Sequence, residues 1–96
     1  MKRILLIGSG GHSRSLIDLI ETTGQWNIYG LIGFPHQIGG NVLGYPIIGS
    51  DEDLPKLRKN CSSAVLAIGQ LPNPAKREKY STYLRELNFH FPVLFL

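Results

Sequence analysis

The sequence contains a single cysteine, Cys61, among its 96 residues, so no disulfide can form within the chain. A lone thiol without a neighbouring catalytic pattern is interpreted as a small packed residue, and it suits the reducing cytoplasm where we expect the protein to work. The sequence also lacks a cluster of acidic residues or thiols with the spacing of metal ligands, so we expect no metal site. His36 and His90 have no partner at such a spacing either, and we interpret them as loop or surface residues.

Long hydrophobic runs are absent as well, so no segment can span a membrane. Four apolar residues after Met1–Arg3 imitate the start of a signal peptide, but Gly8 interrupts the run too early. The net charge is +3, and much of the basic content lies in Lys56–Lys59 and Lys76–Arg85, which we interpret as solvated helix faces. Aromatic residues are not interleaved with these cations, so we expect neither a nucleic-acid partner nor a membrane partner.

The most informative segment that is present reads ILLIGSGGHS, at residues 4–13. Apolar Ile4–Ile7 predicts a buried strand, and Gly8–Gly11 predicts a tight turn into a helix that starts near His12. Glycines let a ligand approach the main chain closely, and a helix start offers unpaired N–H donors and a positive dipole end, which suit a phosphate. The segment therefore predicts a nucleotide- or phosphate-binding unit. The alternative interpretation is a tight strand–helix turn without a ligand.

This segment matches the dinucleotide-binding fingerprint only in part. Gly8 and Gly10 supply its first two glycines, but Ser13 stands where the third is expected. The acidic residue that binds ribose after the second strand is also missing, because Gly33 and Phe34 follow that strand. A nicotinamide- or CoA-binding domain is therefore the weaker alternative.

Apolar segments alternate with helical patterns along the chain, which predicts one α/β domain over residues 1–96. We expect a three-layer, Rossmann-like, doubly wound parallel sheet with strand order 3-2-1-4-5. Pro46 lacks an N–H donor, so we place the third strand at an edge. The five expected strands are Arg3–Ile7, Asn27–Ile32, Tyr45–Ile48, Ala64–Ile68 and Phe91–Leu96.

Three helices are expected between these strands: His12–Thr23 ending at Gly24, Pro55–Lys59 after a short turn at Asp51–Asp53, and Pro74–Leu87. Ser50 and Asp53 have the spacing of a capping box. The last helix has an apolar stripe at i, i+3, i+4 and i+7, which we expect to be buried. Its members are Tyr80, Tyr83, Leu84 and Leu87.

Ligands of such sheets bind at the carboxyl ends of the strands, where the strand order reverses. The expected order brings two glycine turns together there, Gly8–Gly11 after the first strand and Gly69-Gln70 after the fourth. Ser9 and Ser13 offer hydroxyl donors, or they simply pack as small residues. Gln70 contacts a base or sugar, or it simply forms its turn. The candidate binding residues from the two turns are Gly8, Ser9, Gly10, Gly11, His12, Ser13, Gly69 and Gln70.

The motifs together resemble one family. Gly8-Ser9-Gly10-Gly11-His12 resembles the G-x-G-G-H opening of the sugar O-acyltransferases, the family of sialic acid O-acetyltransferase and bacillosamine acetyltransferase. The resemblance continues through residues 42–54, residues 67–70 and the closing Phe91-Pro92-Val93. It implies that His12 donates to a phosphate or sugar hydroxyl, although His12 could instead simply cap the helix. It also adds Arg77, which matches a basic position of the family, as a candidate binding residue; an ion pair or a surface position is the alternative for Arg77.

The resemblance implies a two-part enzyme. Its N-terminal Rossmann-like domain holds a sugar or nucleotide sugar, and a β-helix of hexapeptide repeats binds acetyl-CoA, carries the catalytic histidine and forms a trimer. Residues 1–96 contain no such repeats, so we expect no catalytic residue and no cofactor in this chain, and a partner domain after Leu96. We accordingly expect a monomer or weak dimer from this chain alone. A non-catalytic remnant or regulatory domain is a further alternative.

Overall fold

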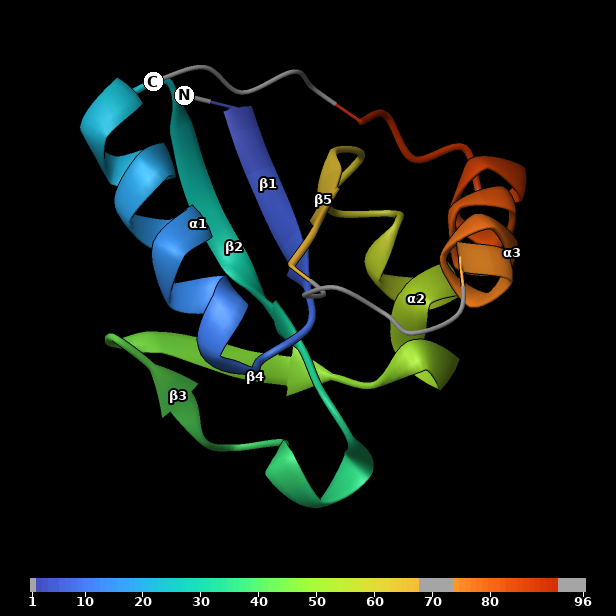
Figure 1. The fold of residues 1–96 in the computed structure, drawn as a ribbon, viewed down its shortest axis with the longest axis horizontal. Coiled ribbons are helices and arrows are strands. Elements are labelled where there is room, and N and C mark those ends of the chain that lie inside the picture. Colours follow the sequence, from blue (N-terminus) through green and yellow to red (C-terminus); the bar gives the residue numbers. More distant parts are fainter. Residues whose placement is uncertain (1, 68–73, 92–96) are drawn as a thin grey trace.

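The computed structural model describes residues 2–67 and 74–91, which form a sheet of five strands with helices on both faces (Figure 1). The sheet order is β3-β4-β2-β1-β5, and all neighbouring strands are parallel except the β3–β4 pair. The strands are β1 (Lys2–Ile7), β2 (Trp26–Ile32), β3 (Asn41–Val42), β4 (Tyr45–Gly49) and β5 (Ala64–Leu66). The predicted Rossmann-like α/β class is confirmed.

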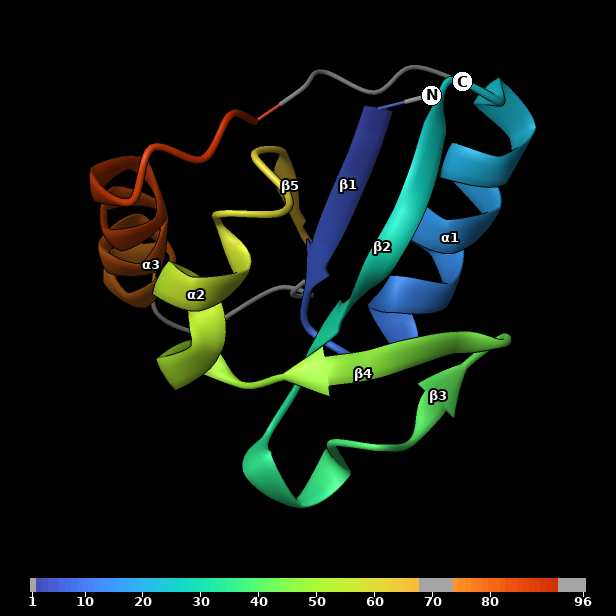
Figure 2. The same ribbon diagram turned by 180° about the vertical axis from the view of Figure 1, so that it is seen from behind.

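The helices cover opposite faces of the sheet. The helix α1 (Gly11–Thr23) lies on one side, and α2 (Leu54–Leu57) and α3 (Pro74–Glu86) lie on the other, as Figure 2 also shows from behind. Alternation along β1 builds both cores, because successive side chains of a strand point to opposite faces. Ile4 and Leu6 pack in the cluster that contains α1, whereas Leu5 and Ile7 pack in the cluster that contains α2 and α3. All four are buried, as expected for an interior strand that is covered on both faces.

Local signals at helix ends are confirmed. Gly24 ends α1 in the left-handed conformation at φ 66°, and its N–H donates to the Ile20 carbonyl. A short 3₁₀ turn, η2 (Asp51–Asp53), precedes α2. The Ser50 N–H donates to the Asp53 carboxylate at 2.8 Å, as the predicted capping box requires. The Ser50–Asp53 contact fixes the chain directly after the carboxyl end of β4.

The prediction that Tyr45–Ile48 is an edge strand is wrong. The two-residue strand β3 pairs antiparallel with β4, with Asn41 opposite Pro46 and Val42 opposite Tyr45, so β3 forms the edge. The hairpin turns through Leu43 and Gly44, both at positive φ (52° and 90°), which is the backbone of a tight two-residue hairpin turn. Leucine rarely adopts positive φ, so this turn could not be predicted from the residues that form it.

The rest of the predicted strand order agrees with the structure. The predicted third, second, first and fourth strands lie side by side as β4, β2, β1 and β5. The predicted fifth strand lies outside the described residues except for Phe91. Just before it, His90 forms an isolated parallel bridge with Ser63.

The buried stripe predicted for α3 is corrected at one position. Leu84 is fully buried and Tyr80 and Leu87 are partly buried, but Tyr83 is 37% exposed. Tyr83 lies at the margin of the helix face that Tyr80, Leu84 and Leu87 share.

The 3₁₀ turn η1 (Pro35–Gln37) is a further element, in the segment predicted to be a loop. Among the described residues, no helix combines the length and apolarity needed to cross a membrane.

Candidate functional site

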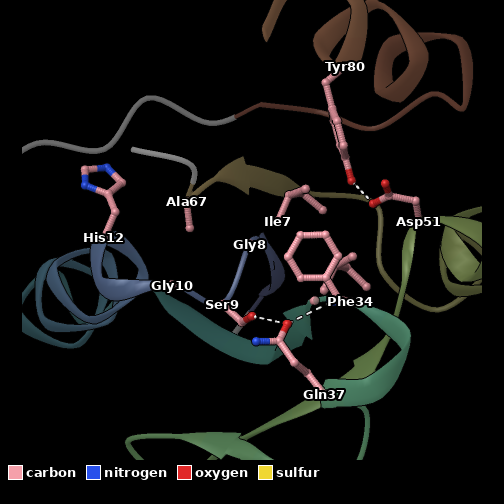
Figure 3. Close-up of a pocket in the computed structure, with 12 residues that line it drawn as sticks. Ile7, Gly8, Ser9, Gly10, His12, Phe34, Gln37, Asp51, Ala67 and Tyr80 are labelled. Atoms are coloured by element: carbon pink, nitrogen blue, oxygen red, sulfur yellow. Dashed lines mark hydrogen bonds between the residues drawn. The ribbon is translucent and has the colours of Figure 1, made fainter. Parts of the chain in front are cut away.

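A cavity of about 460 Å³ lies at the carboxyl ends of the parallel strands (Figure 3). Its wall includes Ile7 and Gly8 after β1, Ile32 and Gly33 after β2, and Ala67 after β5. The strand order reverses between β1 and β5, so the cavity occupies the place where ligands of such sheets bind. The volume is in the range of small-molecule sites.

Gly8 shapes the floor of this cavity. Its φ is +122°, a conformation that side chains rarely adopt, and a Cβ at this position would lie 2.7 Å from the Ala67 carbonyl oxygen. The Gly8 N–H donates to the Ile32 carbonyl at 2.8 Å, and the Ala67 N–H donates to the Ile7 carbonyl at 2.8 Å. The close approach of the segments after β1 and β5 therefore requires a glycine here.

The turn after Gly8 presents main-chain donors. The backbone N–H groups of Ser9, Gly10 and His12 have no hydrogen-bond partner within residues 2–67 and 74–91. They lie at the N-terminal end of the 13-residue helix α1, where the helix dipole is positive. Gly10 has open space around its would-be Cβ, and the exposed His12 side chain borders the cavity. This geometry suits an anionic group such as a phosphate.

Ser13 does not line the cavity. Its side chain is fully buried, and its hydroxyl donates to the Gly10 carbonyl at 2.5 Å. The bond holds the first turn of α1 against the glycine turn, and the small side chain lets α1 pack closely. In this structure the Ser13 side chain therefore packs in the interior and hydrogen-bonds to the glycine turn.

Sequence reasoning missed Gln37, which lies in η1 between β2 and β3. Its side-chain oxygen accepts a hydrogen bond from the Ser9 hydroxyl at 2.9 Å and another from the Phe34 N–H at 2.8 Å. Gln37 therefore ties the loop after β2 to the glycine turn after β1 (Figure 3). No sequence motif points to Gln37, because its contact with Ser9 joins residues that are 28 positions apart in the chain.

Phe34 and the Tyr80–Asp51 pair complete the cavity wall. Phe34 is 68% exposed and its ring points into the cavity (Figure 3). On another side of the cavity, the Tyr80 hydroxyl of α3 donates to the Asp51 carboxylate of η2. Burial, the hydrogen bond to Asp51 and the charge of Asp51 all raise the pKa of Tyr80. This pair connects α3 to the end of β4.

The raised pKa of Tyr80 predicts a loss of stability in alkali. Tyr80 stays protonated in the folded state above pH 10, where the unfolded chain releases the proton, so stability falls as pH rises beyond about 10. The Tyr80→Phe variant should lose less stability between pH 9 and 11 than the wild type, as measured by urea unfolding. The Tyr29→Phe variant, at a tyrosine of β2 that is not among the groups that shift the Tyr80 pKa, is the control and should retain the wild-type pH dependence. An identical slope for Tyr80→Phe and wild type would contradict the Tyr80–Asp51 contact.

The other predicted binding residues are placed only in part. Gly8, Ser9, Gly10 and His12 lie together at the cavity, and Gly11 begins α1 next to them. Gly69 and Gln70 lie outside the described residues. Arg77 lies within α3, and its side chain is outside the described part of the structure. The convergence of the two glycine turns therefore stays a prediction.

Neither a metal cluster nor a reactive thiol is found among the described residues. Over residues 2–67 and 74–91, no group of three or more His, Cys, Asp and Glu is arranged to hold a metal ion. Cys61 is buried, and its thiol contacts the Ser63 carbonyl oxygen at 3.4 Å. Burial raises the pKa of the Cys61 thiol, opposite to the lowered pKa that activates a nucleophilic cysteine.

Comparisons with known proteins identify a family and similar structures. Residues 3–84 match the family described as the PglD N-terminal domain. A comparison with curated protein sequences gives no significant match. A similar structure is perosamine N-acetyltransferase from Caulobacter crescentus, solved with CoA and GDP-perosamine: it is 28% identical with a TM-score of 0.77, and the match covers 93% of this chain and 40% of that one.

Two further structures are similar. The acetyltransferase domain of PglB from Neisseria gonorrhoeae, solved with acetyl coenzyme A, is 26% identical with a TM-score of 0.76 over 97% of this chain and 43% of that one. UDP-D-quinovosamine 4-dehydrogenase from Vibrio fischeri has a TM-score of 0.80 over 94% of this chain and 75% of that one, but at 17% identity it shows the fold alone. This chain thus spans about two fifths of the acetyltransferase structures it matches. The family match confirms the resemblance found in the sequence, and the chain belongs to the PglD N-terminal domain family of sugar acetyltransferases.

Proposed function

We propose that residues 1–96 form a substrate-binding domain that holds a nucleotide sugar in the cavity at the carboxyl ends of the strands. The observation that carries this proposal is the position of that cavity beside the N–H groups of Ser9, Gly10 and His12, which have no hydrogen-bond partner among the described residues. A related acetyltransferase was solved with GDP-perosamine, which is itself a nucleotide sugar: it combines a base, a diphosphate and a sugar. The domain belongs to a sugar acetyltransferase family, so its substrate is the sugar that receives the acetyl group.

The diphosphate of the ligand would lie against the Ser9, Gly10 and His12 N–H groups. A diphosphate carries charge and several acceptor oxygens, and these donors at a helix start satisfy them without a lysine or a metal ion. His12 stands at the cavity border, where its ring can donate to a phosphate or a sugar hydroxyl. The described cavity has acceptors on its other side, at Asp51, for a hydroxyl or amino group of the sugar.

The acetyl transfer itself would belong to another domain. The family resemblance implies that acetyl-CoA and the histidine general base lie in a β-helix, and residues 1–96 contain no hexapeptide repeats. We therefore assign binding and orientation of the sugar, and no catalytic residue, to this domain. The identity of the bound sugar decides whether the acetyl group is transferred to an amine or to a hydroxyl. The cytoplasmic location of the protein stays a prediction.

Isothermal titration with a ligand panel tests the proposal. The panel consists of UDP-glucose, GDP-mannose, CMP-sialic acid, free sialic acid, NAD and CoA. Binding of at least one nucleotide sugar, more tightly than NAD and CoA, supports the proposal. Preferential binding of NAD or CoA would favour the rival nicotinamide- or CoA-binding domain, and no binding by any of them would favour a non-catalytic remnant or regulatory domain.

A cavity-filling variant makes the test specific. Gly10 has an extended backbone (φ −79°, ψ −169°) that any residue adopts, and no atom lies within 4 Å of its would-be Cβ. Gly10 is also the N-cap of α1, so the Gly10→Leu variant should lose about 1 kcal/mol of stability, the cost of a poor N-cap residue, and more than about tenfold in nucleotide-sugar affinity. The matched control is Gln25→Leu, an exposed position just before β2 at the opposite end of that strand, which should change neither quantity. Unchanged affinity in Gly10→Leu would place the ligand elsewhere.

A further inference from the structure

The Gln37 side chain can donate a hydrogen bond to a ligand but cannot accept one, because its oxygen is already occupied. A backbone N–H always donates, so the Gln37 atom that contacts the Phe34 N–H at 2.8 Å is the amide oxygen. That oxygen cannot donate, so the Ser9 hydroxyl must donate to it across 2.9 Å. The two bonds use both lone pairs of the oxygen. The Gln37 NH₂ group has no partner among the described residues, and Figure 3 shows it turned away from Phe34, on the Ser9 side.

Gly33 makes this arrangement possible. A Cβ at position 33 would lie 2.6 Å from the Gln37 amide oxygen and 2.9 Å from the Ser9 hydroxyl oxygen. Any side chain there would push Gln37 out of its bonds with Ser9 and Phe34. Gly33 directly follows β2, where dinucleotide-binding proteins carry an acidic residue for the ribose. This chain therefore has a fixed amide donor near the place where those proteins have a carboxylate.

Phe34 supplies an exposed aromatic face next to this donor. Its ring is 68% exposed, lines the cavity, and lies nearly parallel to the His36 ring, with 4° between the planes and 5.9 Å between the centroids. The Phe34 N–H bond to Gln37 fixes the backbone that carries the ring. An exposed aromatic ring held at a cavity wall is a platform on which a nucleobase stacks, whatever its identity.

We propose that Phe34 and Gln37 recognise the base of the nucleotide, and that they select uracil or guanine over adenine. This inference rests on the proposed function. Phe34 stacks on the base, and the Gln37 NH₂ donates to a ring carbonyl such as uracil O4 or guanine O6. Adenine has an amine in place of that carbonyl. Glutamine usually reads adenine through its oxygen and nitrogen together, and here the oxygen is already saturated by Ser9 and Phe34.

Titration of the full chain with UDP, GDP and ADP tests the selection. UDP or GDP should bind about tenfold more tightly than ADP, the effect of one hydrogen bond made to one base and lost with the other. The Gln37→Glu variant keeps an oxygen for Ser9 and Phe34 but replaces the NH₂ donor with an acceptor. Its negative charge weakens all three nucleotides, so the readout is the ratio of affinities. That ratio should fall to about one or reverse in favour of ADP.

Two further variants separate recognition from a structural role. Phe34→Ala should weaken the three nucleotides by a similar factor, on the order of tenfold, and leave their ratio unchanged. Ile38→Ala, at an exposed position on the same loop, is the matched control and should change nothing. Equal binding of ADP and the other two nucleotides, or an unchanged ratio in Gln37→Glu, would overturn base selection while leaving nucleotide binding intact. Failure of all three nucleotides to bind would overturn both this inference and the proposed function.

Discussion

The Gly8→Ala variant should lose at least about 3 kcal/mol of unfolding free energy, a large part of the stability of a domain of this size. Two effects act together at this position. Alanine is strained at φ +122°, and its Cβ would lie 2.7 Å from the Ala67 carbonyl oxygen, which belongs to the rigid backbone. The substitution must therefore separate the segments that follow β1 and β5. Urea unfolding followed by circular dichroism measures the loss.

Gly10→Ala is the matched control for Gly8→Ala. Gly10 belongs to the same turn, but its backbone is extended and a Cβ there meets no atom within 4 Å. Because Gly10 is the N-cap of α1, Gly10→Ala should cost about 1 kcal/mol, well below the loss in Gly8→Ala. Equal losses in the two variants would contradict the close contact of Gly8 with Ala67 and would mean that glycine is needed throughout the turn for its flexibility.

The Leu84→Ala variant should cost about 3 kcal/mol of unfolding free energy. Leu84 is a fully buried residue of α3, and it packs in the cluster formed with Leu5 and Ile7 of β1 and Leu54 of α2. Truncation removes buried methyl groups and leaves a cavity between α3 and the sheet. The same loss loosens the helix that carries Tyr80, so the Tyr80–Asp51 contact at the cavity should weaken too. Urea unfolding measures the first effect.

Tyr83→Ala separates the buried face of α3 from its exposed side. Tyr83 neighbours Leu84 in sequence but is 37% exposed. Its truncation should cost less than about 1 kcal/mol, well below the cost of Leu84→Ala. A larger cost for Tyr83→Ala than for Leu84→Ala would show that α3 packs through the face on which Tyr83 lies.

The parts of the fold that the sequence predicts are those with local causes. An unbroken apolar run made β1 recognisable as a buried strand, and Gly24 marked the end of α1 because glycine readily adopts the left-handed conformation. The capping spacing of Ser50 and Asp53 likewise depends on neighbours three residues apart. Such signals need no knowledge of the rest of the chain.

The missed features depend on tertiary contacts or on an unusual backbone. The β3–β4 hairpin uses Leu43 at positive φ, so its sequence lacks the asparagine or aspartate that marks such turns. Gln37 matters only because Ser9 approaches it in the folded chain, and no spacing predicts that contact. The glycine turn of the site was predictable from residues 4–13, whereas the opposite wall with Phe34, Gln37, Asp51 and Tyr80 was assembled by the fold.

Backbone amide chemical shifts during titration with a nucleotide sugar test the central claim most directly. UDP-glucose and GDP-mannose are added in turn to the isotopically labelled chain. A ligand in the proposed cavity should shift the amides of Ser9, Gly10 and His12 and those of Gly33 to Gln37, and should leave the amides at the start of β1 and β2 unchanged. Shifts confined to the opposite end of the sheet, near Lys2, Arg3 and Ser62, or no shifts with either ligand, would contradict nucleotide-sugar binding at this site.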